Sequence, residues 1–173
     1  MKKIIKLSFA VLFIGFVFNS CKKSSNPPPL TSSMTFSFNG TNQTFNTCFA
    51  LVPTMTASSQ VLITGYNITG GAASNNSFSI QIVHDISTLQ AGQTYPAAAS
   101  TAAANSSSFV FFTDASHDFI TQTANPQGTV MITGVSSSTI TGTFSGDLFA
   151  PNDTNGSTVI YTITNGVFTA SRY

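Results

Sequence analysis

Both histidines of the chain stand directly before an aspartate, as His84-Asp85 and His117-Asp118. Histidine and carboxylate groups serve zinc sites and general acid–base catalysis, provided that the two pairs meet in space. Neighbouring residues on one strand point to opposite faces, so neither pair can chelate a metal alone. A hydrolase that uses the His-Asp pairs is therefore one hypothesis, and a non-catalytic protein is the expectation that we prefer.

Two oxygen-rich stretches make a calcium site an alternative. Asp114 and Asp118 lie four residues apart, and Asp153 and Asn155 lie within a run of asparagine, aspartate and glycine. Calcium prefers such ligands, but the same residues are ordinary turn formers, and neither stretch matches an EF-hand. A calcium-dependent binding module is therefore an alternative function, and no other cofactor is expected.

Further catalytic patterns are missing from the sequence. It contains no Gly-x-Ser-x-Gly segment, no His-Glu-x-x-His segment and no glutamate. Cys48 lies between Thr47 and Phe49, with no base close to it in sequence. A reactive thiolate needs a cationic or basic neighbour, so this pattern predicts a buried, inert thiol.

Charged residues are scarce, which restricts the class of partner. Arg172 is the only strong base after Lys23, whereas all five acids of the chain lie in that same part. Nucleic-acid binding requires a basic face, so we exclude it. Serine, threonine and asparagine fill the polar positions instead, and we expect a protein or glycan partner. Carbohydrate binding would use exposed aromatic residues, for which the Tyr95–Phe112 region is the candidate.

The N-terminus has the organisation of a secretory signal peptide. Lys2, Lys3 and Lys6 are followed by the apolar run Leu7–Phe18. A basic start and a short apolar segment are typical of such signals, and the run is shorter than the roughly 20 residues that span a membrane.

Phe18 and Ser20, placed before Cys21, resemble the bacterial lipobox. The resemblance implies that residues 1–20 are removed and that Cys21 carries diacylglycerol and a further acyl chain such as palmitate. Two chains are needed for stable anchoring. Residues 21–33 would then be a proline-containing tether, and residues 34–173 a single domain. We expect an outer-membrane lipoprotein, with the periplasmic face and the cell surface both open as its location.

Residues 34–173 predict an all-β domain. Short apolar/polar alternations recur between turn signals, and no segment of useful length has helical periodicity. Asn39-Gly40 is typical of a tight hairpin, and Asn165-Gly166 indicates a kink or bulge within the last strand. We expect Gln43–Leu51 to form one return strand with Phe45, Thr47 and Phe49 on one face. The predicted fold is an antiparallel β-sandwich or flattened barrel of about 8–10 strands, largely a meander.

Several segments of this domain are similar to those of an uncharacterised family of Bacteroidota outer-membrane lipoproteins. They are Thr35–Gly40, Ala91–Tyr95, Gly128–Thr133, Thr141–Gly146 and Ile163–Phe168. The chain departs from the family pattern after the hairpin, where a basic and later an aromatic residue are common and Thr41 and Phe45 stand here. The resemblance implies the fold and the compartment, and it transfers no catalytic residue.

Overall fold

The computed structural model describes residues 32–52, 60–99, 103–113, 118–121 and 123–173, without the side chains of Asn75 and Asp118. These residues form eleven strands and one 3-10 turn, η1 (Ile86–Thr88). The strands are β1 (Ser33–Phe38), β2 (Thr41–Phe45), β3 (Thr47–Leu51), β4 (Gln60–Thr69), β5 (Ala72–Val83), β6 (Thr94–Pro96), β7 (Ser106–Phe112), β8 (Asp118–Ile120), β9 (Gly128–Val135), β10 (Thr139–Phe149) and β11 (Val159–Arg172).

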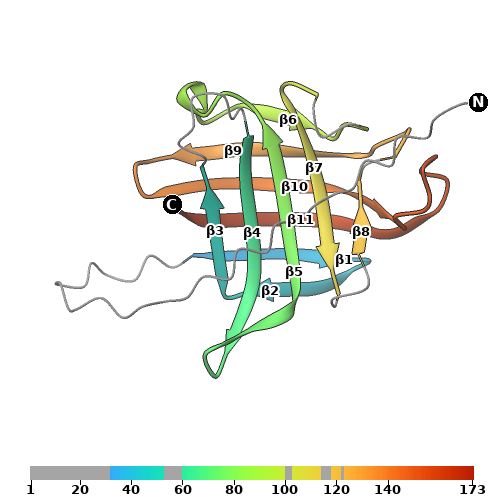
Figure 1. The fold of residues 1–173 in the computed structure, drawn as a ribbon, viewed down its shortest axis with the longest axis horizontal. Coiled ribbons are helices and arrows are strands. Elements are labelled where there is room, and N and C mark those ends of the chain that lie inside the picture. The colour runs from blue at the N-terminus through green and yellow to red at the C-terminus, as the bar shows by residue number, and fades with distance from the viewer. Residues whose placement is uncertain (1–31, 53–59, 100–102, 114–117, 122) are drawn as a thin grey trace, which may run out of the picture.

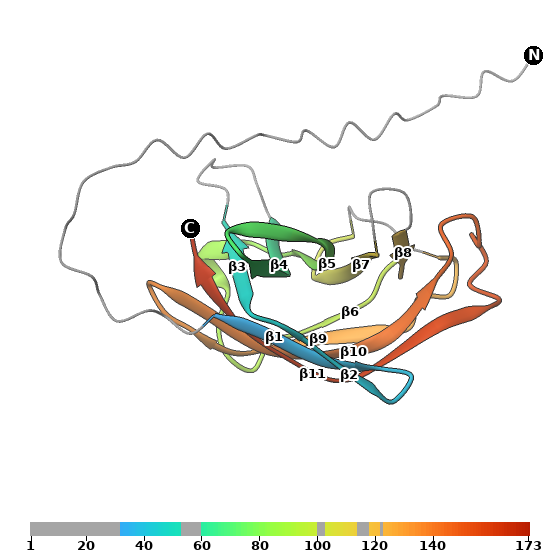
Figure 2. The ribbon, with the colours of Figure 1, turned by 90° about the horizontal axis from the view of Figure 1, so that it is seen from below.

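The strands form two stacked layers (Figure 2). What we name the large layer has the order β2-β1-β11-β10-β9-β6, and the small layer has the order β3-β4-β5-β7-β8. The strands of one layer run across those of the other (Figure 1). Each inner face is apolar, and burial of this apolar surface is the main force that holds the layers together.

The two edge strands of the small layer, β3 and β8, pair with two central strands of the large layer. At one edge the end of β11 pairs in parallel with β3, through Ser171 opposite Phe49 and Arg172 opposite Ala50. At another edge, β10 meets β8 where Phe149 lies opposite Ile120. The result is an all-β sandwich closed into a flattened barrel, which confirms the predicted fold class.

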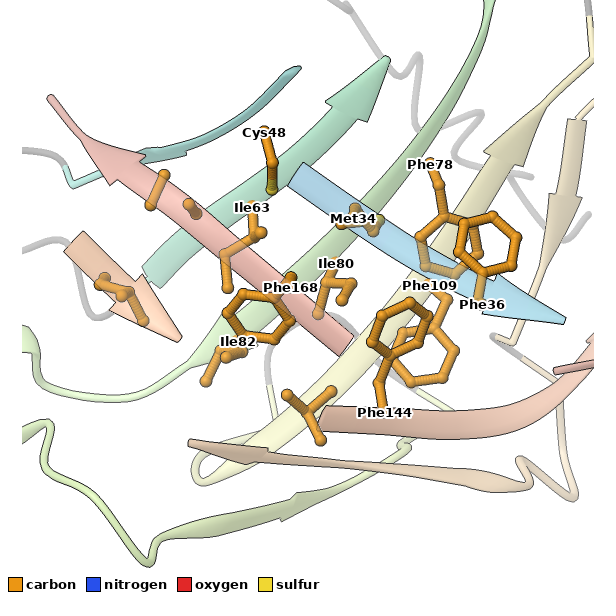
Figure 3. Packing of buried hydrophobic residues seen from close by; sticks show 14 of the residues in the cluster. Met34, Phe36, Cys48, Ile63, Phe78, Ile80, Ile82, Phe109, Phe144 and Phe168 are labelled. Carbon is orange, nitrogen blue, oxygen red and sulfur yellow. The ribbon is translucent and has the colours of Figure 1, made fainter. Parts of the chain in front are cut away.

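Phenylalanine rings fill the space between the layers (Figure 3). Phe36 and Phe144 come from the large layer, and Phe78 and Phe109 come from the small layer. The ring centroid of Phe78 lies 5.0 Å from that of Phe36 and 5.2 Å from that of Phe144. Such ring pairs add stabilisation beyond the area that they bury, so these residues are the principal contact between the layers.

The hairpin predicted at Asn39-Gly40 is confirmed. Both residues have positive φ, 46° and 86°, as a two-residue hairpin of this type requires. The Asn39 amide also anchors the hairpin to β11, because its Oδ1 accepts a hydrogen bond from the Thr162 N–H (2.8 Å) and its Nδ2 donates to the Ile160 carbonyl (3.2 Å).

The single return strand predicted for Gln43–Leu51 is wrong. The chain leaves the large layer after β2, turns at Asn46 and enters the small layer as β3. The turn shifts the alternation, so Cys48 and Ala50 are buried while Phe49 lies on the outer face.

The Asn46 side chain stabilises this corner, because it forms hydrogen bonds with β4 where no residue of β3 pairs with it. Its side chain pairs with the backbone of Ile68 in β4, accepting from the N–H (2.9 Å) and donating to the carbonyl (3.1 Å). The backbone N–H of Asn46 donates to Asn67 Oδ1 (2.9 Å). The amide therefore satisfies the edge of β4 beyond the point at which β3 begins.

We predict that Asn46→Ala lowers the free energy of unfolding by about 1–2 kcal/mol, because it deletes two side-chain hydrogen bonds to Ile68. Urea denaturation measures the change. Asn152→Ala is the matched control, since Asn152 is an exposed asparagine whose side chain forms no hydrogen bond with another described residue. Equal stability of the two variants would contradict this role for Asn46.

Candidate functional site

His84 and Asp85 follow β5 and lie at the start of η1. His84 Nδ1 contacts Asn105 Oδ1 (2.8 Å), and Nε2 contacts Thr88 Oγ1 (3.0 Å). The ring edge also packs against Tyr95, with centroids 5.2 Å apart. Both ring nitrogens are therefore engaged in local contacts that fix the η1 region.

Asp85 caps η1. Its Oδ1 accepts hydrogen bonds from the Ser87 side chain (2.8 Å) and the Ser87 backbone N–H (2.9 Å). These two bonds favour the charged form and lower the pKa of the Asp85 carboxyl. His117 and the Asp118 side chain lie outside the described residues, so the predicted approach of the two His-Asp pairs stays a prediction.

Asp153 stabilises the turn before β11. Backbone N–H groups of Thr158 (2.8 Å) and Ser157 (3.0 Å) donate to Oδ2, and the Ser157 hydroxyl donates to Oδ1 (3.0 Å). Donation from Thr158, followed by Ser157, lowers the pKa of the Asp153 carboxyl. Both carboxylate oxygens thus face hydrogen-bond donors, the arrangement of a turn or cap.

The remaining candidate calcium ligands do not gather around Asp153 in the described part of the chain. The Asn155 carbonyl accepts a hydrogen bond from Asn125 Nδ2 (3.1 Å). Asp114 lies outside the described residues, as does the Asp118 side chain. Among the residues that are described, no group of three or more His, Cys, Asp or Glu side chains could hold a metal ion. Calcium binding through Asp114 and Asp118 is thus an untested hypothesis.

The aromatic residues between Tyr95 and Phe112 do not form the exposed platform that we considered. Tyr95, Phe109 and Phe111 are buried, and Phe112 alone among the described aromatic residues of this stretch is exposed, at 36%. Their burial follows from the inward alternation of β6 and β7. A platform of aromatic rings for sugar binding is therefore not built here.

Several polar side chains lie close together on the outer face of the large layer. At their centre is Asn165 in β11, which adopts the left-handed conformation with φ of 54°. The register of β11 shifts here on both sides, against β1 between Thr35 and Ser37 and against β10 between Phe144 and Gly146. Asn165 is a bulge residue, and such residues are common next to functional sites.

Two hollows meet at Asn165, and we name them together the Asn165 surface. One, of about 410 Å³, is lined on the β9–β10 side by Thr129, Thr143 and Ser145. The other, of about 270 Å³, is lined on the β1–β2 side by Thr35, Asn42, Gln43 and Thr44. Asn165 belongs to both hollows, so the two lie on either side of this one residue.

The polar side chains of the Asn165 surface are neutral and available. No side-chain hydrogen bond to another described residue is formed by Thr35, Asn42, Thr44, Thr129, Thr143, Ser145 or Asn165. Elsewhere neighbouring polar groups pair with each other, as Thr133 does with Thr141 (2.9 Å) and Gln81 with Gln60 (2.9 Å). Val167, exposed by 49%, adds an apolar contact.

The sequence indicated the kink at Asn165 but not the surface around it. Asn165-Gly166 was expected to interrupt one strand. The hollows arise because β1 and β10 flank β11 on its two sides, a pairing that joins the two ends of the domain. No local pattern in the sequence reports this pairing.

The outer face of the small layer is a less distinct surface. Leu51 lies opposite Leu62, and both are exposed. They are followed across the layer by polar residues, including Thr64 and Ser79, whose hydroxyls are 3.0 Å apart. Phe49 and Tyr66 lie on the same face, half-buried, with ring centroids 5.8 Å apart. This face therefore carries a small apolar cluster among polar side chains.

Comparison with protein-family models, curated proteins and solved structures found no match to this chain. The similarity to Bacteroidota lipoproteins noted above therefore stays a prediction. Within the part of the chain that the structure describes, no helix is long and apolar enough to cross a membrane.

The thiol of Cys48 is buried between the layers, as predicted (Figure 3). Burial raises its pKa from 9.0 to about 12. We predict that a thiol reagent at pH 8 labels the folded Cys21→Ala variant at least about a hundredfold more slowly than the urea-unfolded variant.

The same shift predicts how stability depends on pH. The unfolded thiol ionises first, so stability is unaffected by this group below pH 9 and falls as the pH rises from 9 to about 12. Fast labelling of the folded variant, or a Cys48→Ala variant that retains the full alkaline loss of stability, would contradict this account.

Proposed function

We propose that this chain is a lipid-anchored, non-catalytic binding protein of the bacterial outer membrane, with a neutral glycan as its partner. The lipobox-like residues before Cys21 support the anchor. The local hydrogen bonds of His84, Asp85 and Asp153 support structural roles for these groups in place of catalytic ones. The domain thus acts by recognition.

The observation that carries the glycan proposal is the set of unengaged, neutral hydrogen-bonding groups on the Asn165 surface. Sugar hydroxyls donate and accept hydrogen bonds, and an amide such as that of Asn165 offers both functions in one group. The lining holds no charged side chain among its described residues, which favours an uncharged ligand. A length of glycan would cross both hollows and pass over Val167.

The left-handed backbone of Asn165 allows a clean test. Asn165→Gly keeps this conformation and removes only the amide, because glycine adopts positive φ readily. We predict that at least one of starch, xylan and mannan retards the wild-type protein in affinity electrophoresis. The variant should bind it about tenfold more weakly, as expected for the loss of one or two hydrogen bonds.

Asn105→Gly is the matched control, because Asn105 has φ of 55° and lies away from both hollows. It should bind as the wild type does. Absence of retardation by all three polysaccharides, or equal binding by Asn165→Gly and the wild type, would overturn the glycan proposal.

The anchor has its own test. We predict that Cys21→Ala moves the protein from the membrane fraction to the soluble fraction and abolishes its labelling with radioactive palmitate, since no acyl chain then holds it. Membrane retention of Cys21→Ala without palmitate would contradict a lipid anchor. Protease treatment of intact wild-type cells distinguishes the two possible faces, since only a surface-exposed domain is cut.

A further inference from the structure

Strand β2 is an unprotected edge of the large layer. It is the terminal strand, and no described strand pairs with its outer side. Its five residues, Thr41–Phe45, include neither a charged residue nor a proline. Proteins usually protect such edges, as at the opposite edge of this layer, where β6 has three residues and ends in Pro96. The backbone groups along β2 are therefore available to another strand.

The hairpin of β4 and β5 extends past this edge. In Figure 1 its end projects beyond β2, and Figure 2 shows the hairpin in the small layer. Ile68, Thr69, Ala72, Ala73 and Ser74 are all exposed, so the end of the hairpin lacks packing on either face. A bare two-stranded ribbon is marginally stable in water. A strand added to β2 would lie beneath this ribbon and cover its inner face.

A hollow beside β2 provides room for the neighbouring chain. It has a volume of about 430 Å³ and lies between the β1–β2 hairpin and the ends of β5 and β7. Thr41 and Gln43 line it from β2, and Phe38, Phe111 and Tyr161 give it an apolar side. This hollow would receive side chains or a hairpin end from the partner.

We propose that the occupant of this edge is a second copy of the chain, with β2 paired antiparallel to its equivalent about a twofold axis near Gln43. This register places Asn42 of each copy opposite Thr44 of the other. Both are exposed on the outer face, and an amide can hydrogen-bond to a hydroxyl across strands. A symmetric contact of this kind closes at two copies and satisfies both edges.

The lack of charge allows two identical edges to pair. Like charges facing one another would repel two identical edges, and β2 carries none. The dimer also joins the two Asn165 surfaces, because Asn42 and Thr44 line the hollow on the β1–β2 side. This last consequence rests on the proposed glycan function, whereas the dimer itself does not.

Charge-swapped variants test the pairing without any glycan. The full chain, solubilised in density-matched detergent, should sediment at equilibrium as a concentration-dependent dimer. Asn42→Lys/Thr44→Lys places lysines opposite one another, as Asn42→Glu/Thr44→Glu does with glutamates. Each double variant should dissociate at least about tenfold more readily than the wild type, and mixing the two should restore dimers through two opposite-charge pairs.

Thr162→Lys/Thr164→Lys is the matched control, since both threonines are exposed on a central strand of the same layer. It should dimerise as the wild type does. A wild type that stays monomeric at all concentrations, a lysine variant that still dimerises, or a mixture that does not recover would each overturn the proposal. Loss of glycan retardation with dimerisation intact would instead overturn only the proposed glycan partner.

Discussion

The contact of Phe78 with Phe36 and Phe144 is the interaction on which the structure depends. These rings meet where the strands of the two layers cross, and they come from parts of the chain far apart in sequence. Neither layer could keep its inner face in water, because apolar side chains make up most of that face. The polar outer faces, including the Asn165 surface, are consequences of this arrangement.

The core and the Asn165 surface are coupled through one bulge. On the inner side of β11, a side chain at Gly166 would collide with the Phe144 ring and backbone, so only glycine allows Phe144 to pack as it does. Directly before it, Asn165 turns into the left-handed conformation and has no register partner on either neighbouring strand. The irregularity that accommodates the core ring thus also creates the hollow outside. Substitutions at Gly166 would disturb both.

Local patterns predicted the parts of the fold that local chemistry decides. Asn39-Gly40 formed its turn because both residues tolerate positive φ, and Phe78, Ile80 and Ile82 point inward because alternation and burial coincide. The prediction for Gln43–Leu51 was wrong because Asn46 turns the chain between layers, and its partner, Ile68, lies far along the sequence. Periodicity cannot report a contact of that range.

Prediction of the candidate site met the same limit. Histidine and aspartate are candidates because their side chains are common in catalytic and metal sites. In this structure, however, His84, Asp85 and Asp153 form hydrogen bonds within nearby turns. The residues of the Asn165 surface are common threonines, serines and amides, distinguished only by their shared position and by their lack of partners. Such a surface becomes visible only when the strand order is known.

Hydrogen–deuterium exchange of the full chain, with and without a neutral polysaccharide that retards it, tests the central claim most directly. Asn165 stands outside the regular ladders on both sides of β11, so its amide should exchange readily in the free protein. We predict that the polysaccharide slows exchange at residues 165–167 and 143–145, with no change at residues 60–66 of the small layer. Protection confined to the small layer, or none at the bulge, would contradict it.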